Sequence, residues 1–212
     1  MSKLLNKFYK LHPQPTSLKK AIETAKRANI RGKVILDPFC GTGTILLACM
    51  VARAKKAIGS DIEDYNDILR ADFGNPFLKT WLRTDTEVEL HWHIDALESI
   101  HKFEHDVLFT DPPNPVALLG GTQISVVRDI GLHGSQIRKF WSERLSKQNL
   151  MGKGQRTVAY VIKLVKTELE NDKRVIVNLF RHGNFSYKRV FEKVFKIKHL
   201  YANWFEVIGL KD

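Results

Sequence analysis

The sequence predicts an α/β protein with a mostly parallel sheet, helices on both faces of the sheet and an antiparallel hairpin at the C-terminus. Three observations favour this fold class. Short apolar runs typical of buried strands alternate with longer segments whose apolar residues recur at helical spacing. The glycine turn Gly41-Thr42-Gly43 joins one such run to an apolar helix. Two strand-like runs follow near the C-terminus, and Ala202-Asn203 is suited to join them as a hairpin.

The predicted elements follow one another in a regular order. Ser17 is placed to cap a first helix over residues 17–30, and Gly32 is expected to end it. The predicted strands cover residues 33–36, 56–60, 88–94, 106–110, 174–180, 197–201 and 204–210. The further predicted helices cover residues 44–55, 158–169 and about 187–195.

Length and composition indicate a single domain. The chain has 212 residues, 43% of them hydrophobic, which suffices for the core of one α/β domain. We therefore expect one domain over residues 1–212, with a basic N-terminal segment over 1–33 and a basic, glycine-punctuated insertion over 115–157. The longest apolar run, from Ile45 to Ala52, is far shorter than the roughly 20 residues of a membrane helix. The N-terminus does not have the pattern of a secretion signal, so a cytoplasmic protein is expected.

Two basic blocks account for the net charge of +11. Residues 1–33 hold nine Lys and Arg against one Glu, and residues 128–156 hold seven against one Asp and one Glu. Such blocks suit a polyanionic partner, because each phosphate contact releases a counterion. The alternative is that they serve general solubility. The residues predicted to contact nucleic acid are Arg128, Arg138, Lys139, Arg144 and Lys147.

The cysteines and histidines predict neither a disulfide framework nor a metal site. Cys40 lies in the glycine turn and Cys49 on the following helix, so a disulfide framework is not expected. His101 and His105 have the i, i+4 spacing of one helical face. Because the sequence shows no third ligand, the interpretation of a solvated helix face is favoured and no metal site is predicted.

Four acidic residues fall at the ends of four successive predicted strands. Asp37, Asp61, Asp95 and Asp111 each come directly after a predicted strand. Ligands of parallel α/β sheets bind at the carboxyl ends of the strands. The sequence therefore predicts a ligand site at that edge of the sheet.

The glycine turn narrows the type of ligand. Gly41 and Gly43 allow close approach of the backbone, but Leu46 stands where a dinucleotide site usually has a third glycine, which disfavours a nicotinamide cofactor. The Lys-Ser/Thr end of a phosphate-binding loop is missing, which disfavours ATP. Asp61, 18 residues after Gly43, can accept hydrogen bonds from both ribose hydroxyls. A nucleoside without phosphates fits best; the alternative is an ordinary turn that starts a helix.

This combination resembles the S-adenosylmethionine site of class I methyltransferases, which have a Rossmann-like fold. The resemblance implies that Asp37 lies near the cofactor amino group, Asp61 at the ribose and Asp95-Ala96 beside the adenine. The segment from His12 to Ser17 resembles the segment of tRNA guanine-N2 methyltransferases and amino-methylating DNA methyltransferases that closes over the cofactor. The implied cofactor-binding residues are Asp37, Pro38, Phe39, Cys40, Gly41, Thr42, Gly43, Thr44, Asp61, Ile62, Asp95, Ala96, His12 and Thr16.

The stretch Asp111-Pro112-Pro113-Asn114 resembles the Asp/Asn-Pro-Pro-aromatic motif of methyltransferases that act on exocyclic amines of bases. An amine conjugated to a ring is a poor nucleophile until hydrogen-bond acceptors favour its tetrahedral form. Asp111 and the Pro112 carbonyl would supply those acceptors, and the prolines would fix the backbone. The four residues are the predicted catalytic set; a proline-rich turn that merely ends a strand is the alternative.

Taken together, the motifs look like those of archaeal and eukaryotic tRNA guanine-N2 methyltransferases over about residues 8–115. This chain differs in having Asn114 where the family usually has an aromatic residue that stacks on the base. The aromatic residues that could replace it, or that could simply belong to the core, are Phe73, Phe77, Trp81, Phe140 and Trp141.

The resulting prediction is a methyltransferase that uses S-adenosylmethionine to modify an amino nitrogen of a nucleic-acid base, with RNA preferred over DNA. Two alternatives stay open. One is a DNA adenine-N6 methyltransferase. The other, suggested by Asn114, is an inactive protein that binds the cofactor and nucleic acid as a partner subunit. A protein partner that supplies substrate recognition is compatible with each of these interpretations.

Overall fold

The structure is a computed structural model. It describes residues 17–62, 64, 73, 79–80, 82–112, 153–179, 181–182 and 185–211, with the backbone alone at 153–157, 181–182 and 185. Among the described residues, no helix is long and apolar enough to cross a membrane.

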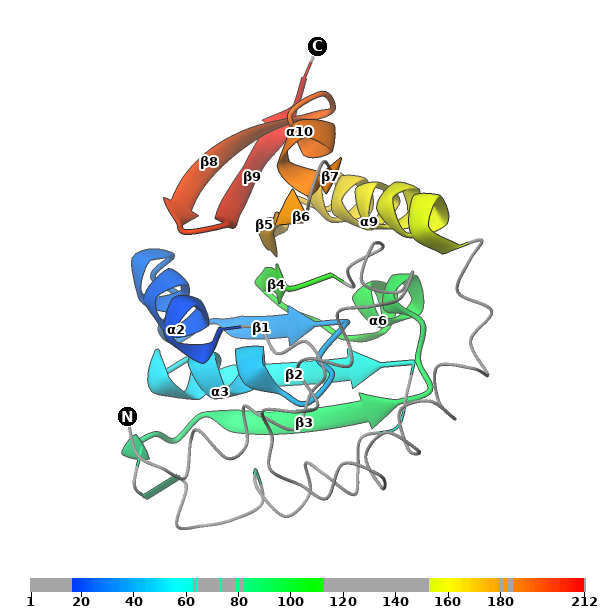
Figure 1. The fold of residues 1–212 in the computed structure, drawn as a ribbon. Coiled ribbons are helices and arrows are strands. Elements are labelled where there is room, and N and C mark those ends of the chain that lie inside the picture. Colours follow the sequence, from blue (N-terminus) through cyan, green and yellow to red (C-terminus); the bar gives the residue numbers. More distant parts are fainter. Residues whose placement is uncertain are drawn as a thin grey trace, which may run out of the picture.

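A seven-stranded sheet with the order β3-β2-β1-β4-β5-β9-β8 forms the centre of the fold. Neighbouring strands from β3 to β5 are parallel, whereas β9 runs antiparallel to β5 and to β8. Figure 1 shows the strands stacked from β3 at the bottom to β8 near the top. The strands are β1 Val34–Asp37, β2 Lys56–Asp61, β3 Glu87–Trp92, β4 Val107–Thr110, β5 Arg174–Asn178, β8 Phe195–Tyr201 and β9 Trp204–Leu210. The predicted Rossmann-like sheet with its C-terminal antiparallel hairpin is therefore confirmed.

Helices cover both faces of this sheet (Figure 1). Two of them, α2 and α3, pack on one face, and the other three pack on the opposite face. The helices are α2 Leu18–Arg27, α3 Thr44–Val51, α6 Ala96–Lys102, α9 Lys153–Glu170 and α10 Tyr187–Phe191. A separate two-stranded ribbon of β6 (Arg181–His182) and β7 (Phe185–Ser186) precedes α10.

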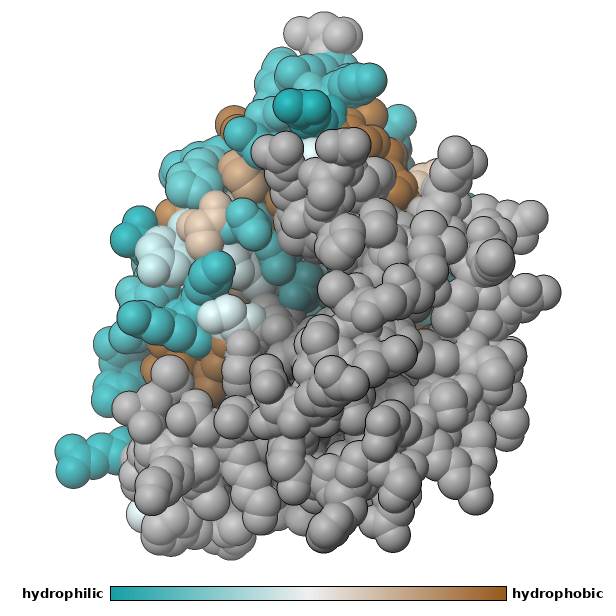
Figure 2. Space-filling model, viewed as in Figure 1, coloured by the Kyte–Doolittle hydropathy of each residue, from teal (hydrophilic) through white to brown (hydrophobic). Residues whose placement is uncertain are grey.

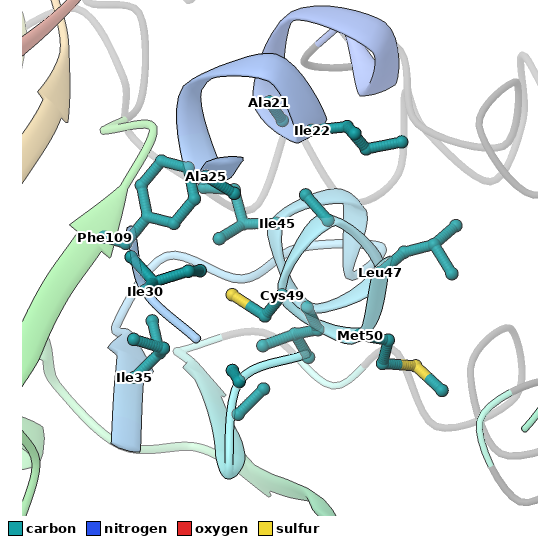
Figure 3. Close-up of a cluster of buried hydrophobic side chains, with 14 of the residues drawn as sticks. Ala21, Ile22, Ala25, Ile30, Ile35, Ile45, Leu47, Cys49, Met50 and Phe109 are labelled. Atoms are coloured by element: carbon teal, nitrogen blue, oxygen red, sulfur yellow. The ribbon is translucent and has the colours of Figure 1, made fainter. Parts of the chain in front are cut away.

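The core on the first face packs closely because small residues line α2. Ala21 and Ala25 are fully buried, and Figure 3 shows them with Ile22 beside Ile45 of α3. Side chains that short let two helix backbones approach one another. Nearly every residue of α3 is buried, since the helix lies between the sheet and α2. The apolar helix that follows the glycine turn is thus held firmly, and its N-terminus is fixed at the carboxyl edge of the sheet.

The core on the second face is rich in aromatic residues. Tyr187, Phe191 and Phe195 are fully buried, with ring centroids 6.1 Å apart for the first pair and 5.2 Å apart for the second. These separations are in the range of favourable aromatic pairs. The cluster anchors α10 and β8 to the end of the sheet formed by β5 and β9.

A buried pair, His105 and Glu168, ties α9 to the start of β4. Their Nε2 and Oε2 atoms are 2.6 Å apart, and the Nδ1 of His105 donates to the carbonyl of Phe103 at 2.7 Å. Lys173 donates to the carbonyl of His105 at 2.7 Å. The expected helical pairing of His101 with His105 is wrong, because α6 ends at Lys102 and the extended Phe103 turns His105 into the core. No group of three metal-ligating side chains occurs among the described residues.

The first helix differs from its prediction at both ends. Ser17 occupies the N-cap position, but its side chain makes no capping hydrogen bond; its carbonyl accepts from the amide of Ala21 instead. The helix ends at Arg27, well before Gly32, because Asn29 takes a left-handed conformation with φ of 49°. Asparagine tolerates that conformation better than most residues, so it acts as a stop signal.

The C-terminal hairpin has an irregular outer strand. The pairing of β8 with β9 shifts register after Lys196 and again after His199. Lys196 and Lys198 are exposed, as is Ile208 on β9 at 60%. Figure 2 shows that the surface over this part of the molecule is mainly hydrophilic, with hydrophobic side chains visible between the polar ones.

Candidate functional site

The glycine turn folds back over the end of β2. Three backbone amides fix it: that of Cys40 donates to the carbonyl of Ser60 at 3.0 Å, that of Gly41 to Asp61 Oδ2 at 2.9 Å, and that of Gly43 to the carbonyl of Cys40 at 2.8 Å. Gly41 and Gly43 have φ of 48° and 78°, values that favour glycine. The turn therefore leads directly into the N-terminus of α3, as the sequence predicts.

Gly59 on β2 makes room for this turn. A Cβ atom placed there would lie 2.7 Å from Cδ1 of Leu46 and 3.0 Å from both Cβ and Sγ of Cys40. Leu46 is fully buried, so it has little freedom to move away. The close contact of α3 and the turn with β2 thus requires glycine at position 59, a requirement that the sequence analysis missed.

Asp37, at the end of β1, is 1% exposed. Its Oδ1 accepts hydrogen bonds from the hydroxyl of Thr110 at 2.7 Å and from the amide of Phe39 at 3.2 Å. Burial raises the pKa of Asp37 from 3.8 to about 8, the two hydrogen bonds oppose this, and the nearby charges of Asp111 and Asp61 add to it. The carboxyl group is thus ready to release a proton when a cation comes close.

Asp61 ends β2 and is followed by an exposed apolar residue. Its carboxylate accepts the amide of Gly41, so it braces the glycine turn from the neighbouring strand. Ile62 is 62% exposed, the highest exposure of the large hydrophobic residues that the structure describes. A carboxylate beside an uncovered aliphatic side chain suits a ligand with hydroxyl groups and a flat apolar ring.

Asp95 lies three residues beyond β3 and caps α6. Its Oδ1 accepts from the amide of Leu97 at 2.9 Å and from the hydroxyl of Tyr160 on α9. The same hydroxyl accepts from the amide of Leu97 at 2.9 Å. Burial, followed by the hydrogen bond to Asp95, raises the pKa of Tyr160 well above its usual range. Ala96, the neighbour predicted beside the adenine, is buried at the start of α6.

Asp111 directly follows β4, beside the end of β5. Its Oδ1 accepts from Nδ2 of Asn178, the last residue of β5, at 3.0 Å. The pairing of Thr110 with Val177 places these two residues next to one another at the carboxyl edge. Pro112 is buried, and Pro113 and Asn114 lie outside the described residues. The carboxylate predicted to accept the substrate amine is thus held by a partner that the sequence analysis did not identify.

Both cysteines are buried. Cys40 is 5% exposed and Cys49 is fully buried, and each is a free thiol. Burial raises the pKa of both thiols well above the usual value, and for Cys40 the nearby carboxylates of Asp61 and Asp37 add to the shift. A thiol that stays protonated is a poor nucleophile, and both side chains pack in the core of the first face.

The structure thus brings together the predicted residues of the glycine turn, Asp37, Asp61, Ile62, Asp95, Ala96, Asp111 and Pro112 along one edge of the sheet. Phe73 belongs to the core beside α2 and α3, at 9% exposure, so it is not available to stack on a substrate. The predicted residues outside the described part of the chain are His12, Thr16, Pro113, Asn114, Arg128, Arg138, Lys139, Arg144 and Lys147, together with the aromatic candidates Phe77, Trp81, Phe140 and Trp141.

Three residues near this edge were missed, namely Thr110, Tyr160 and Asn178. Each meets a predicted aspartate from a position 65 to 73 residues away in the sequence. A polar residue at or beside a strand end was the only available signal for Thr110 and Asn178. Tyr160, on an amphipathic helix, offered none.

Comparisons with known proteins give structural matches only. No family model and no curated protein matches the chain. TrmN from Thermus thermophilus is 17% identical with a TM-score of 0.47, over 100% of this chain and 53% of that chain. A ribosomal protein L11 methylase from Lactobacillus delbrueckii subsp. bulgaricus is 13% identical with a TM-score of 0.40, over 89% and 75% of the two chains.

A further structural match is the PRMT1 enzyme-prozyme complex of Trypanosoma brucei with AdoHcy. It is 17% identical with a TM-score of 0.36, over 53% of this chain and 34% of that chain. The functional conclusion for this chain therefore rests on its own residues.

Proposed function

We propose that this protein is an S-adenosylmethionine-dependent methyltransferase that acts on an exocyclic amino group of a nucleic-acid base, with RNA preferred. The observation that carries the proposal is the position of Asp111. It lies at the same edge of the sheet as Asp37 and Asp61, and it is oriented by Asn178 from the adjacent strand. A carboxylate held at this edge, beside a glycine turn suited to a nucleoside, matches the chemistry of amine methylation.

The residues at the ends of β1 and β2 fit the cofactor. Gly41 and Gly43 carry no side chains, so a ligand can approach the backbone at the N-terminus of α3. Asp61 can accept ribose hydroxyls, and Ile62 offers an apolar surface for the adenine ring. Asp37 has the charge to attract the cofactor ammonium group once its proton is released. When bound, S-adenosylmethionine would supply the electrophilic methyl group.

The residues at the ends of β4 and β5 would act on the target amine. Asp111 would accept one hydrogen of the amine as its nitrogen becomes tetrahedral, which frees the lone pair for the methyl group. The hydrogen bond from Asn178 limits the rotation of the carboxylate, so this acceptor is in place before the substrate arrives. The carbonyl of Pro112 is a second candidate acceptor.

The charge distribution supports a nucleic-acid substrate. The basic blocks over 1–33 and 128–156 suit contacts to phosphates, and the motifs resemble those of archaeal and eukaryotic tRNA guanine-N2 methyltransferases. DNA adenine-N6 methylation uses the same amine chemistry and is the first alternative. The second is an inactive partner subunit, which the presence of Asn114 in place of a stacking residue favours.

One experiment tests these alternatives together. Purified protein is incubated with S-adenosylmethionine carrying a radiolabelled methyl group and with total RNA or genomic DNA, and the nucleosides are then separated. We expect label in a methylated guanosine of RNA. Label in N6-methyladenine of DNA would favour the first alternative. Binding of the cofactor without label in either nucleic acid would favour the inactive subunit.

A further inference from the structure

Asn178 has one side-chain atom whose role is not explained by the fold. It is the last residue of β5 and lies beside Asp111 at the carboxyl edge of the sheet. The backbone of Asn178 is paired with Trp204 of β9, and the amide of the next residue, Leu179, donates to the carbonyl of Asn203 at 2.7 Å. The backbone at the end of β5 is therefore fixed by the C-terminal hairpin.

The hydrogen bond to Asp111 determines how the amide group is oriented. A carboxylate can only accept, so the atom of Asn178 at 3.0 Å from Asp111 Oδ1 must be the donor Nδ2. The carbonyl oxygen Oδ1 then faces away from this bond. It is buried and has no hydrogen-bond partner among the described residues. Buried carbonyl oxygens normally have a partner, so this atom is suited to receive a donor from a ligand.

The neighbouring tyrosine adds no competing charge. Tyr187 is fully buried. Burial, with a further contribution from the charge of Asp111, raises the pKa of Tyr187 well above its usual range, so its hydroxyl stays neutral. Asp111 and Asn178 therefore form a charged acceptor and a neutral acceptor side by side, which matches the two hydrogens of a primary amine.

We infer that Asn178 is a catalytic residue that recognises the target amine: its Nδ2 orients Asp111 and its Oδ1 accepts one of the amine hydrogens. This inference rests on the proposed function and names the residue that selects for a primary amine. As the nitrogen lone pair forms the new N–C bond, the S–C bond breaks and its electron pair stays on sulfur. The nitrogen then loses one proton to water.

The first arm of the test measures methyl transfer by two variants of this position. Asn178→Leu removes both hydrogen-bonding functions, and we expect kcat to fall at least tenfold while the KM for S-adenosylmethionine changes little. Asn178→Asp keeps an acceptor but places a second carboxylate against Asp111, so the two share a proton until the pH is high. While the proton is shared, the new carboxyl group donates to Asp111 as Nδ2 does and keeps its other oxygen as an acceptor. Activity should therefore stay within a few-fold of the parent near pH 6 and fall near pH 9, where both carboxylates are ionised and Asp111 has lost its donor.

Asn203, in the turn between β8 and β9, offers a matched control. Asn203 is exposed, and its backbone carbonyl, which accepts from Leu179, is unaffected by a change of side chain. Asn203→Leu and Asn203→Asp should both keep the parent rate and pH profile. If the two Asn178 variants behave like the Asn203 variants, the inference is overturned. Melting temperatures of all four variants show whether a lost rate reflects unfolding.

The second arm does not depend on turnover. Sinefungin carries an amino group where S-adenosylmethionine carries the transferable methyl group, whereas S-adenosylhomocysteine has nothing there. We expect the parent to bind sinefungin more tightly than S-adenosylhomocysteine and the ratio of the two affinities to fall about tenfold in Asn178→Leu, as for one lost hydrogen bond to a charged donor. Isothermal calorimetry measures both affinities.

The two arms separate the inference from the proposed function. If the affinity ratio falls in Asn178→Leu while the parent methylates neither RNA nor DNA, the amine acceptor is supported and the nucleic-acid substrate is rejected. If Asn178→Leu has the same affinity ratio as the parent and the parent does methylate RNA, only the role of Asn178 is rejected. Failure of both ligands to bind the parent would reject the cofactor site and the inference with it.

Discussion

The amide of Gly41 donates to the carboxylate of Asp61 across 2.9 Å, so the glycine turn is held by a side chain from the neighbouring strand. Because the same carboxylate is proposed to bind the cofactor ribose, one residue both shapes the site and takes part in it. Replacing Asp61 should therefore affect ligand binding more than a change in surface charge would.

The first prediction is that Asp61→Ala weakens S-adenosylmethionine binding by about 1.5–3 kcal/mol, the range for hydrogen bonds to a charged group. Asp106→Ala is the matched control, since Asp106 accepts the amide of Val34 at 2.8 Å near the start of β1, at the opposite edge of the sheet. That variant should lose stability but keep the affinity of the parent. Calorimetry gives both affinities, and an equal affinity for Asp61→Ala would remove Asp61 from the site. NAD and ATP should not bind the parent.

The second prediction concerns the proton on Asp37. Its pKa is raised from 3.8 to about 8 in the folded protein. A raised pKa contributes stability that is complete below about pH 4 and is lost as the pH rises through about 8. Asp37→Asn keeps an acceptor for Thr110 but has no proton to release, so its stability should not fall in this way. The unfolding free energy of the parent should therefore fall relative to that of the variant from pH 5 to pH 8, as denaturant titrations can measure.

Cofactor binding gives an independent measurement of the same proton. If the ammonium group of the cofactor lies near Asp37, binding favours the carboxylate and releases a proton at pH 7. Calorimetry in two buffers of different ionisation enthalpy counts the protons released. On cofactor binding, the parent should release about one proton more than Asp37→Asn does. Equal counts would place the ammonium group elsewhere.

The third prediction is that Asp111→Ala lowers turnover about a hundredfold or more while cofactor affinity stays nearly unchanged. The reason is that Asp111 is expected to bind the amine mainly in the transition state, and one such stabilising group has that magnitude. Asn114→Tyr should retain or raise activity by restoring a stacking surface. Methyl transfer by an Asp111→Ala variant at the parent rate would rule out the proposed mechanism.

The fourth prediction is that Gly59→Ala destabilises the protein by about 1–3 kcal/mol, as expected for overpacking, and also weakens cofactor binding. The added Cβ would press on Leu46 and Cys40 and so displace the glycine turn. Gly32→Ala provides the contrast, because its Cβ meets nothing within 4 Å and only its φ of 72° causes strain. That variant should lose stability and keep cofactor affinity. Chemical denaturation measures the stability of both variants, and calorimetry measures their cofactor affinity. A Gly59→Ala variant that binds the cofactor as tightly as Gly32→Ala would show that the turn does not depend on Gly59.

The fifth prediction is that nucleic-acid binding falls steeply with salt, since the basic blocks should contribute mainly phosphate contacts. Neutralising Arg138, Lys139 and Arg144 together should flatten that dependence, because fewer counterions are released. Fluorescence titrations of labelled RNA at several salt concentrations give the slope. A slope equal to that of the parent would assign the block over 128–156 to solubility.

Much of the fold could be predicted because the strands are short, apolar and bounded by aspartates. The runs that precede Asp37 and Asp61 gave the strand positions to within one residue. Helix ends were harder, because they depend on local backbone conformation. The positive φ of Arg53, just beyond α3, left that helix shorter than its apolar sequence suggests. The bounds of the small α6 were not predicted, because its apolar face is only two turns long.

The candidate site could be predicted one residue at a time but not as a network. Motifs identified Asp37, Asp95 and Asp111, since each stands at a recognisable point in the chain. Their partners depend on which strands and helices become neighbours, and that is settled by packing over the whole sheet. The contact of Asn178 with Asp111 follows from the parallel pairing of β5 with β4, which the sequence alone does not reveal.

The two register shifts in β8 bear on how molecules of this protein meet one another. A sheet can grow between molecules when its outermost strand offers a long, flat and regular row of backbone groups. Here the pairing slips after Lys196 and after His199, and the exposed Lys196 and Lys198 bring positive charge to the same strand. Two copies that approached along β8 would oppose lysine to lysine on an uneven backbone. This edge is thus protected against strand addition, and self-association would have to use a different surface.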